Sequence, residues 1–356
     1  MLHHGLGDVV AALPMLRSLD KGLPPGARLL VLVKSPVETS ALDCVAWRTP
    51  MQTLQLGARR DWKAVLDLTD EARAVRAFRP DVFLAPHAAD SLPAALFAAS
   101  TGAPLRVGVS GRWAALGYNR RVEPDESVHK AVFYARFAEA AGLRRLGDPL
   151  RFPTPALAHG PARSPGRTIV LAPGSGEVER HKRWPLENFA ELGRRLLGHA
   201  PDVRLLLFGG RNETELLQTL AAGIGPDPRV EVCASATIAQ SLERLAAADL
   251  LVSACSGSIH LGAWAGLPIV GLYGPTNPVH TGPYSDKAHI LRLGYGCSPC
   301  YRKEFRTGCG EPACMSGLSV DLAFRQALVA LEGGPRPHIP TLTTTRATRP
   351  DRTVAA

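Results

Sequence analysis

Groups that could hold an anion are concentrated between residues 249 and 284. A short apolar run at 250–252 is followed by a turn that contains Ser256, Gly257 and Ser258, where a helical run begins. Since the start of a helix exposes unpaired N–H groups and the positive end of the helix dipole, this turn predicts a site for an anion such as a diphosphate. The alternative is that Ser256 or Ser258 only caps a structural helix.

A second candidate anion site follows the apolar run 168–171. Gly174 and Ser175 belong to a loop of small residues, which lets the backbone approach a ligand closely. Lys182 comes next, within the sequence Lys-Arg-Trp-Pro, and its ammonium group can neutralise phosphate oxygens. The alternative for Lys182 is an ordinary solvated charge at a helix end.

Three acidic residues stand where helices are predicted to begin. Asp8 follows a glycine-rich turn, and Glu213 and Glu215 follow the apolar run 203–208. Judged by position alone, such carboxylates more often cap a helix or face its dipole than take part in chemistry.

Four of the seven cysteines form a cluster in a loop rich in glycine and proline: Cys297, Cys300, Cys309 and Cys314. A two-residue spacing followed by two further thiols suits tetrahedral coordination of zinc or iron. Four protein ligands leave no open position, so such a metal would be structural. The alternative is four free thiols, because a reducing cytoplasm disfavours disulfides.

The motifs together resemble the signature of glycosyltransferase family 9, the ADP-heptose:lipopolysaccharide heptosyltransferases. In that family an Asp-Thr/Ser-Gly-x-x-His segment precedes a Phe/Tyr-Gly-Pro-Thr-x-Pro segment. The corresponding residues here are Ser256-Gly257-Ser258-Ile259-His260 and Tyr273-Gly274-Pro275-Thr276-Asn277-Pro278. Cys255 stands in place of the family's Asp, which bears on how firmly a donor is held.

Two further segments carry the same resemblance. The Lys-x-Trp-Pro pattern occurs here from Lys182 to Pro185, and a Gly-Asp-Val turn occurs at Asp8. The strand that precedes this turn in family members is missing. Either the recorded start lies too far downstream, or the first sheet lacks a strand.

The resemblance implies two facing Rossmann-like domains of the GT-B type, with the active site in the interdomain cleft. The second domain would bind an ADP-sugar, foremost ADP-L-glycero-D-manno-heptose, and Asp8 would be the general base of an inverting transfer. Lys182 and the helix start would stabilise the departing diphosphate without a catalytic metal. The donor-binding residues implied are Gly174, Ser175, Lys182, one of Glu213 and Glu215, Ser256, Gly257, Ser258 and His260.

Alternating strand and helix patterns predict a parallel sheet in each half of the chain. Strands are expected at 28–33, 81–85 and 105–109, and then at 168–171, 203–208, 230–233, 250–252 and 269–272, where the signature stretch closes the second sheet. The expected organisation is an acceptor domain at 1–150, a linker at 151–167, a nucleotide-sugar domain at 168–334 and a disordered tail at 335–356.

The 356 residues carry a formal net charge of +9, mostly in the first domain and the tail. A basic first domain suits a phosphorylated glycolipid acceptor at the inner membrane surface. The candidate contacts are Arg59, Arg60, Lys63 and Arg120, with solvated surface as the alternative. No apolar run is long enough to span a bilayer and no signal-peptide pattern opens the chain, so we expect a cytoplasmic protein, peripheral at most.

Other classes of function are less well supported. The chain lacks a basic stripe interleaved with aromatic residues and any zinc-finger or RNA-binding signature, which disfavours a nucleic-acid partner. No G-x-G-x-x-G motif follows a strand, which disfavours a dinucleotide dehydrogenase. Two alternatives stay open: a glycosyltransferase with a protein or other glycan acceptor, and a non-catalytic nucleotide-sugar-binding protein.

Overall fold

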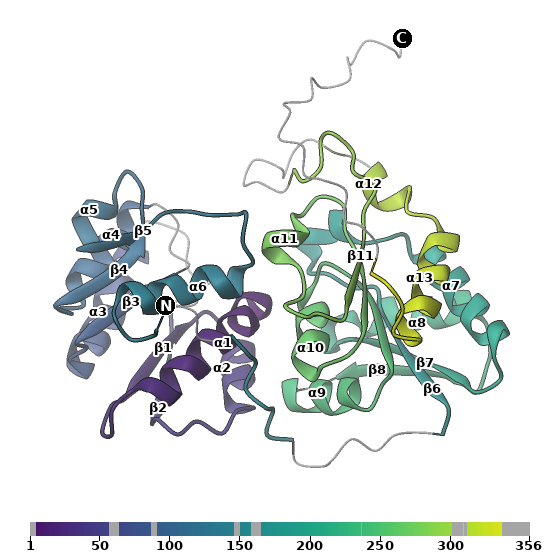
Figure 1. Cartoon of the computed structure of the whole chain (residues 1–356), viewed down its shortest axis with the longest axis horizontal. Helices are drawn as coiled ribbons and strands as arrows, with labels where there is room; N and C mark the ends of the chain where they lie inside the picture. Colours follow the sequence, from purple (N-terminus) through teal and green to yellow (C-terminus); the bar gives the residue numbers. More distant parts are fainter. Residues whose placement is uncertain are drawn as a thin grey trace, which may run out of the picture. The chain divides into compact units, whose positions relative to one another are not determined.

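The chain forms two compact units in a computed structural model (Figure 1). The first comprises Met1–Ala158 with Thr237–Ala239, and the second comprises His159–Ala236 with Gln240–Ala356. The boundary at 158/159 falls inside the segment expected to be a linker. The structure describes residues 5–56, 64–86, 91–145, 150–157, 165–235, 237–300, 309 and 312–336.

The first unit alternates helices and short strands. In chain order its elements are α1 (Leu6–Gly22), β1 (Leu29–Val33), α2 (Pro36–Asp43), β2 (Met51–Gln55), α3 (Ala64–Phe78), β3 (Val82–Ala85), α4 (Leu92–Ser100), β4 (Leu105–Val109), α5 (Ala114–Gly117), β5 (Arg120–Val122) and α6 (Lys130–Ala140). Their described strands form two parallel sheets, ordered β1-β2 and β3-β4-β5.

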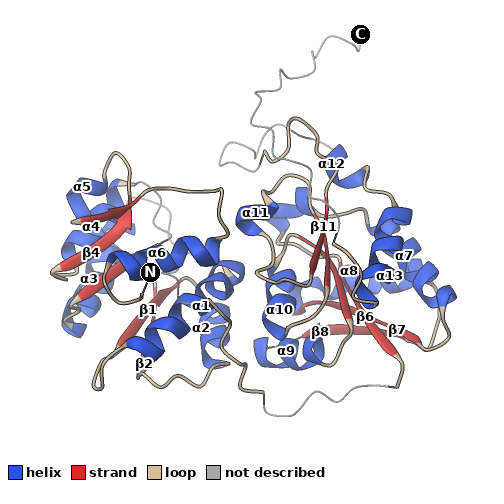
Figure 2. Ribbon diagram, in the orientation of Figure 1, coloured by secondary structure: helices blue, strands red, loops and turns tan. Residues whose placement is uncertain are grey.

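The second unit is built from longer elements around one sheet. They are β6 (Arg167–Ala172), the 3-10 helix η1 (Glu177–Lys182), α7 (Leu186–His199), β7 (Val203–Gly210), η2 (Arg211–Glu213), α8 (Thr214–Ile224), β8 (Val230–Ser235), α9 (Ile238–Ala246), β9 (Leu250–Ala254), α10 (Gly257–Ala265), β10 (Ile269–Leu272), α11 (Pro278–Thr281), β11 (Ala288–Leu291), α12 (Ala313–Ser316) and α13 (Val320–Leu331). In Figure 2, α7 and α13 lie on one side of the sheet and α9 and α10 on the other.

All six strands of the second sheet are parallel, in the order β11-β10-β9-β6-β7-β8. Read from β8, this is the doubly wound order of a Rossmann fold, with the chain reversing its direction of travel between β6 and β9. Ala172 at the end of β6 is paired with Ser253 near the end of β9. Ligands of such sheets bind outside the carboxyl ends of the strands at this switch point.

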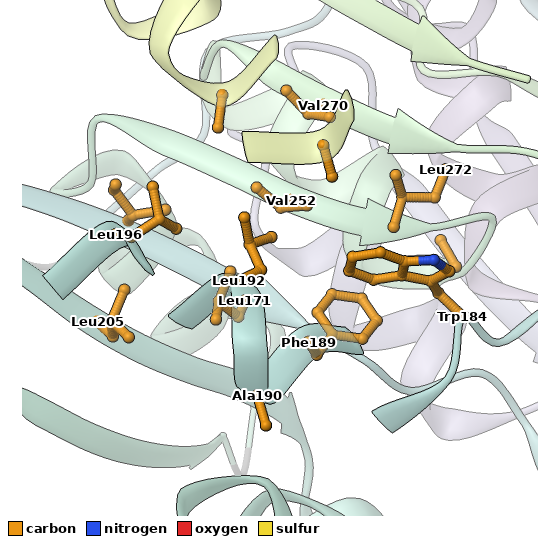
Figure 3. Close-up of a cluster of buried hydrophobic side chains, with 14 of the residues drawn as sticks. Leu171, Trp184, Phe189, Ala190, Leu192, Leu196, Leu205, Val252, Val270 and Leu272 are labelled. Atoms are coloured by element: carbon orange, nitrogen blue, oxygen red, sulfur yellow. The ribbon is translucent and has the colours of Figure 1, made fainter. Parts of the chain in front are cut away.

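A continuous apolar core fixes the second sheet. All five residues of β9 are buried, as expected for a central parallel strand covered on both faces. Trp184 is 1% exposed, meets Phe189 edge-to-face with ring centroids 5.0 Å apart, and donates its indole N–H to the Leu318 carbonyl at 2.9 Å (Figure 3). The tryptophan of the Lys-x-Trp-Pro pattern therefore anchors the chain between η1 and α7.

The structure corrects the expected elements in several places. The second sheet does not close with the signature stretch, because β11 adds a sixth strand beyond it. The strands β2 and β5 were not among the expected strands. Within the described chain, no helix has both the length and the apolar character needed to cross a bilayer.

Candidate functional site

The two predicted anion loops adjoin in the second unit. The loop 173–176 leaves β6 and the turn at Ser256 leaves β9, and these two strands are neighbours at the switch point. Both loops therefore emerge from the carboxyl edge of the sheet, where a bound nucleotide is expected. The sequence predicted both loops, and the sheet order shows that they leave neighbouring strands at the same edge.

Glu213 closes one side of the loop at Gly174. A β-carbon added at residue 174 would overlap Glu213 Oε1, so this carboxylate lies directly against the glycine. Glu213 Oε2 also accepts a hydrogen bond from the backbone N–H of Gly210 at 2.9 Å. Glu215, by contrast, lies exposed in the first turn of α8. Of the two candidate acids, the structure brings Glu213 to the switch-point site.

Lys182 lies at the end of η1 and is only 7% exposed. Its Nζ is 2.8 Å from Glu179 Oε1, and Ser175 Oγ donates to the Glu179 backbone carbonyl at 3.0 Å. Lys182 is therefore tied through Glu179 to the small-residue loop, which excludes the interpretation as a solvated helix-end charge. Burial, together with the Lys182 ammonium, lowers the pKa of neighbouring His181. The lowered pKa favours the neutral form of the His181 imidazole. Lys182, rather than His181, is therefore the candidate cation at this end of η1.

The turn before α10 follows β9, the strand next to β6. Ser256 is the N-cap residue, yet its side chain makes no capping bond and meets Ser253 Oγ at 3.3 Å. The Ser256 side chain therefore does not cap α10. Gly257, Ser258 and His260 lie on the first turn of α10 and are half-buried, and the N–H groups of a helix start can bind an anion.

Cys255, which replaces the family's Asp, is buried rather than presented to a ligand. The Tyr273 hydroxyl hydrogen-bonds the Cys255 thiol, and burial together with this thiol raises the pKa of Tyr273. The tyrosine hydroxyl also donates to the Thr281 carbonyl at 3.3 Å. Cysteine at this position thus joins β9 to the second signature segment.

Thr276, in the second signature segment, was not among the expected site residues. It is 3% exposed, and its hydroxyl is buried without a hydrogen-bond partner among the residues that the structure describes. Buried polar groups are normally satisfied, so such a hydroxyl in a binding motif points to a partner supplied by a ligand or water. Thr276 belongs to the Tyr-Gly-Pro-Thr-x-Pro segment of the sequence, but nothing in the sequence indicates that its side chain is buried.

The cysteine loop packs onto the same signature segment. The Cys300 backbone N–H donates to the Pro275 carbonyl at 2.9 Å, and Ser298 Oγ donates to the Gly274 carbonyl. A β-carbon at Gly274 would come within 2.7 Å of Cys314 Sγ, so the glycine permits the loop to approach. The loop is therefore held to the signature segment by hydrogen bonds and packing.

The four thiols differ in exposure. Cys297 and Cys309 are exposed, whereas burial, reinforced by the neighbouring thiols, raises the pKa of Cys300 to about 12 and that of Cys314 to about 11. In the described chain, no group of three or more His, Cys, Asp or Glu side chains is placed to hold a metal ion. The described geometry does not support the expected zinc or iron site, and none of the four described cysteines forms a disulfide.

Alkylation kinetics would test this assignment of the thiols. At pH 8 we expect iodoacetamide to modify Cys297 and Cys309 first, with Cys300 and Cys314 slower by roughly 100-fold, because the thiolate is the reactive form. Peptide mass spectrometry at timed intervals measures each rate. Protection of all four thiols that is lost on adding a chelator would instead assign them to a metal.

Asp8 is the centre of a separate cluster in the first unit. It lies in the first turn of α1, after Gly5, whose φ of 149° favours glycine. Lys130 Nζ is 2.6 Å from Asp8 Oδ1, and the Tyr134 hydroxyl donates to the same oxygen at 3.2 Å. Lys130 and Tyr134 are four residues apart on α6 and so share a helix face. The carboxylate is therefore held by two side chains that sequence reasoning did not identify.

The expected acceptor contacts receive less support. Arg120 is exposed on β5, and its guanidinium donates to the Ala140 carbonyl at the end of α6 at 2.6 Å, which is a structural role. Arg59, Arg60 and Lys63 lie outside the described residues.

Two α/β units, one of them built on a six-stranded Rossmann sheet, are the components of the GT-B type of glycosyltransferase fold. Solved structures confirm this fold. E. coli ADP-heptose lps heptosyltransferase II aligns with 92% of this chain and 96% of its own, with a TM-score of 0.70 and 21% identity. E. coli heptosyltransferase WaaC with ADP aligns with 93% and 98%, with a TM-score of 0.68 and 21% identity.

The chain belongs to glycosyltransferase family 9 (heptosyltransferase), whose model matches residues 72–310. Lipopolysaccharide heptosyltransferase 2 of Salmonella typhimurium is 28% identical over 222 residues. That alignment covers 57% of this chain and 63% of the relative, so the chain spans less than two thirds of the curated relative's length. The family expected from the sequence motifs is confirmed.

Proposed function

We propose that the protein transfers heptose from ADP-heptose to a sugar of a lipopolysaccharide core. The observation that carries the proposal is the convergence of the Gly174 loop, Lys182 and the start of α10 at the switch point of one Rossmann sheet. The names of family relatives support the sugar and the acceptor, since they include lipopolysaccharide heptosyltransferases. The structure of a relative with ADP supports the nucleotide.

In the proposed reaction, Asp8 takes a proton from the acceptor hydroxyl. The oxygen then forms a bond to the anomeric carbon as the bond from that carbon to the ADP diphosphate breaks, which inverts the configuration. Lys182 and the N–H groups at Ser256 and Gly257 stabilise the negative charge that develops on the departing diphosphate. Because an ammonium and a helix start supply this positive charge, the proposal includes no catalytic metal.

The Asp8 cluster suits the role of a general base. Lys130 and Tyr134 both bind Oδ1, which fixes the orientation of the carboxylate. Side chains locked by such supporting contacts hold a reactive group in its productive geometry. The net charge of +9 supports an anionic acceptor such as a phosphorylated glycolipid at the inner membrane surface, where a cytoplasmic protein would meet it.

Donor binding tests the assignment of Glu213. We propose that Glu213 accepts hydrogen bonds from the ribose hydroxyls of ADP. Calorimetric titration with ADP should show binding that Glu213→Gln weakens by roughly 10-fold, because an amide offers one acceptor oxygen to the two ribose hydroxyls where a carboxylate offers two. Glu215→Gln is the matched control, since Glu215 is exposed on the following helix, and it should change the affinity less than twofold.

Equal effects of the two substitutions would remove Glu213 from the ribose site. Failure of the unmodified protein to bind either ADP or ADP-heptose would overturn the proposed donor, and with it the proposed function.

A further inference from the structure

Helix α4 in the first unit is apolar on its outer side as well as on its inner side. It contains no charged residue, and Phe97 lies in the buried core of the unit. Leu92, Leu96 and Ala99, at helical spacing, are exposed, with 36% of Leu92 and 52% of Leu96 accessible. Ser100, the only polar side chain of α4, donates its hydroxyl to the Phe97 carbonyl at 2.7 Å. The outer side of α4 therefore presents an apolar stripe.

Helix α5 extends this apolar surface. A β-carbon added at Gly117 would come within 2.1 Å of the Ala95 carbonyl oxygen, so α5 packs directly on α4 (Figure 1). Ala95 and Ala99 are four residues apart and share one side of α4, which places α5 beside the exposed stripe. Leu116 on α5 is 54% exposed. We call the exposed apolar residues of the two helices the α4–α5 face: Leu92, Leu96, Ala99, Ala115 and Leu116.

Helix α7 of the second unit shows the pattern that is usual for a surface helix. Its exposed positions include Glu187, Arg194, Arg195 and His199, whose side chains are charged or polar. An exposed face without such groups is uncommon, and neighbouring exposed apolar side chains mark sites of interaction with a partner.

The surroundings of the α4–α5 face are basic. Residues 91–122, which run from the start of α4 to the end of β5, contain four arginines and no acidic residue. Three of these arginines are exposed, namely Arg112, Arg120 and Arg121. Arg112 directly precedes the half-buried Trp113 at the start of α5, and its guanidinium carbon lies 4.9 Å from the centroid of the Trp113 ring. Leucine, tryptophan and arginine together are typical of surfaces that lie at the boundary between a membrane and water.

We propose that the α4–α5 face docks on a bilayer that contains anionic phospholipid. The exposed leucines enter the boundary between headgroups and acyl chains, and the arginines contact lipid phosphates. Charge favours this partner over a second copy of the chain, because a symmetric dimer through this face would bring its arginines close to those of the other copy. The docking rests on this surface alone and does not depend on the proposed function.

If the proposed function also holds, docking positions the acceptor side of the first unit. Arg112 follows β4 and Lys130 follows β5, so both lie at the carboxyl edge of the sheet β3-β4-β5. Lys130 pairs with Asp8 at 2.6 Å. Docking through Arg112 would therefore hold the edge that carries Asp8 near the lipid headgroups.

Cosedimentation of the full chain with lipid vesicles tests the docking. The protein should bind phosphatidylcholine vesicles with about 30% phosphatidylglycerol roughly 10-fold more tightly than vesicles of phosphatidylcholine alone, because the arginines attract anionic headgroups. Leu96→Glu combined with Leu116→Glu should weaken binding to the anionic vesicles by roughly 30-fold, because it removes apolar contacts and adds negative charge. Both side chains are more than half exposed, so the fold should be kept, which urea unfolding checks.

Val37→Glu is the matched control for the double variant. Val37 is 50% exposed in the same unit, but it lies on α2, which packs against β1. Its replacement should change vesicle binding by less than twofold. Arg112→Ala should weaken binding about fivefold at low salt and much less at about 0.5 M salt, where charges are screened.

Two results would overturn the proposal without reference to heptose transfer, since the vesicles contain no acceptor. One is that the unmodified protein does not bind anionic vesicles, or binds them no more tightly than the Leu96→Glu, Leu116→Glu variant does. The other is a dimer in the absence of lipid that this double variant abolishes, because the α4–α5 face would then belong to a second copy of the chain.

Discussion

Replacing Asp8 with Asn should lower kcat by about 10²- to 10⁴-fold, the range typical of the loss of a general base. The amide keeps the size of the side chain but cannot accept the proton of the acceptor hydroxyl. Affinity for ADP should stay within twofold of the original, because the proposed donor contacts belong to the second unit. Steady-state kinetics and calorimetry on the same preparation measure the two quantities.

Asp125→Asn is the matched control for this substitution. Asp125 is another carboxylate of the first unit that is paired with a basic side chain, Arg136, at 2.8 Å. Its replacement should leave kcat unchanged. Lys130→Met should lower kcat by roughly 10-fold with little change in KM, because Lys130 pairs with Asp8 and we expect it to orient the carboxylate. An Asp8→Asn variant with full activity would remove Asp8 from the mechanism.

Replacing Lys182 with Ala should weaken ADP binding by roughly 30-fold, since a hydrogen bond to a charged group contributes about 2 kcal/mol. The buried ammonium now pairs with Glu179, and we expect it to exchange part of that interaction for a phosphate. The loss should be larger for ADP than for adenosine, which lacks the diphosphate. Titration with both ligands measures the difference.

Arg180→Ala is the control for Lys182→Ala, because Arg180 lies on the same 3-10 helix but is exposed. It should change the affinity for ADP by less than twofold. Urea unfolding of both variants shows whether a lost affinity reflects a lost fold. Equal weakening of ADP and adenosine binding by Lys182→Ala would contradict a contact with the diphosphate.

The second unit was more predictable from sequence than the first. Its central strands, such as β9, are buried along their whole length and so appear as continuous apolar runs between clear turns. The strand β2 reads Met-Gln-Thr-Leu-Gln, has no buried residue, and gives no such signal. Strand β5 has only three residues, two of them exposed arginines. Pairing with the preceding strands β1 and β4, rather than a local sequence pattern, makes these segments strands.

Parts of the site depended on contacts that sequence spacing cannot show. Asp8 and Lys182 were identified because their motifs are local, but Lys130 lies 122 residues from Asp8 and meets it only in the fold. The choice between Glu213 and Glu215 depended on a contact in the fold. Gly174, which follows the neighbouring strand β6, lies against Glu213. The cysteine spacing suggested a metal, yet spacing does not fix whether four thiols converge, and the described ones form no metal-binding group.

The most direct test of the account is product formation from ADP-heptose and a lipopolysaccharide core acceptor that lacks heptose. Mass spectrometry of the acceptor, with and without the protein, reports transfer. The account predicts that the acceptor gains one heptose unit, that ADP is released in equal amount, and that Asp8→Asn abolishes both. Binding of ADP-heptose without any transfer to core, protein or other glycan acceptors would contradict the account and identify a non-catalytic nucleotide-sugar-binding protein.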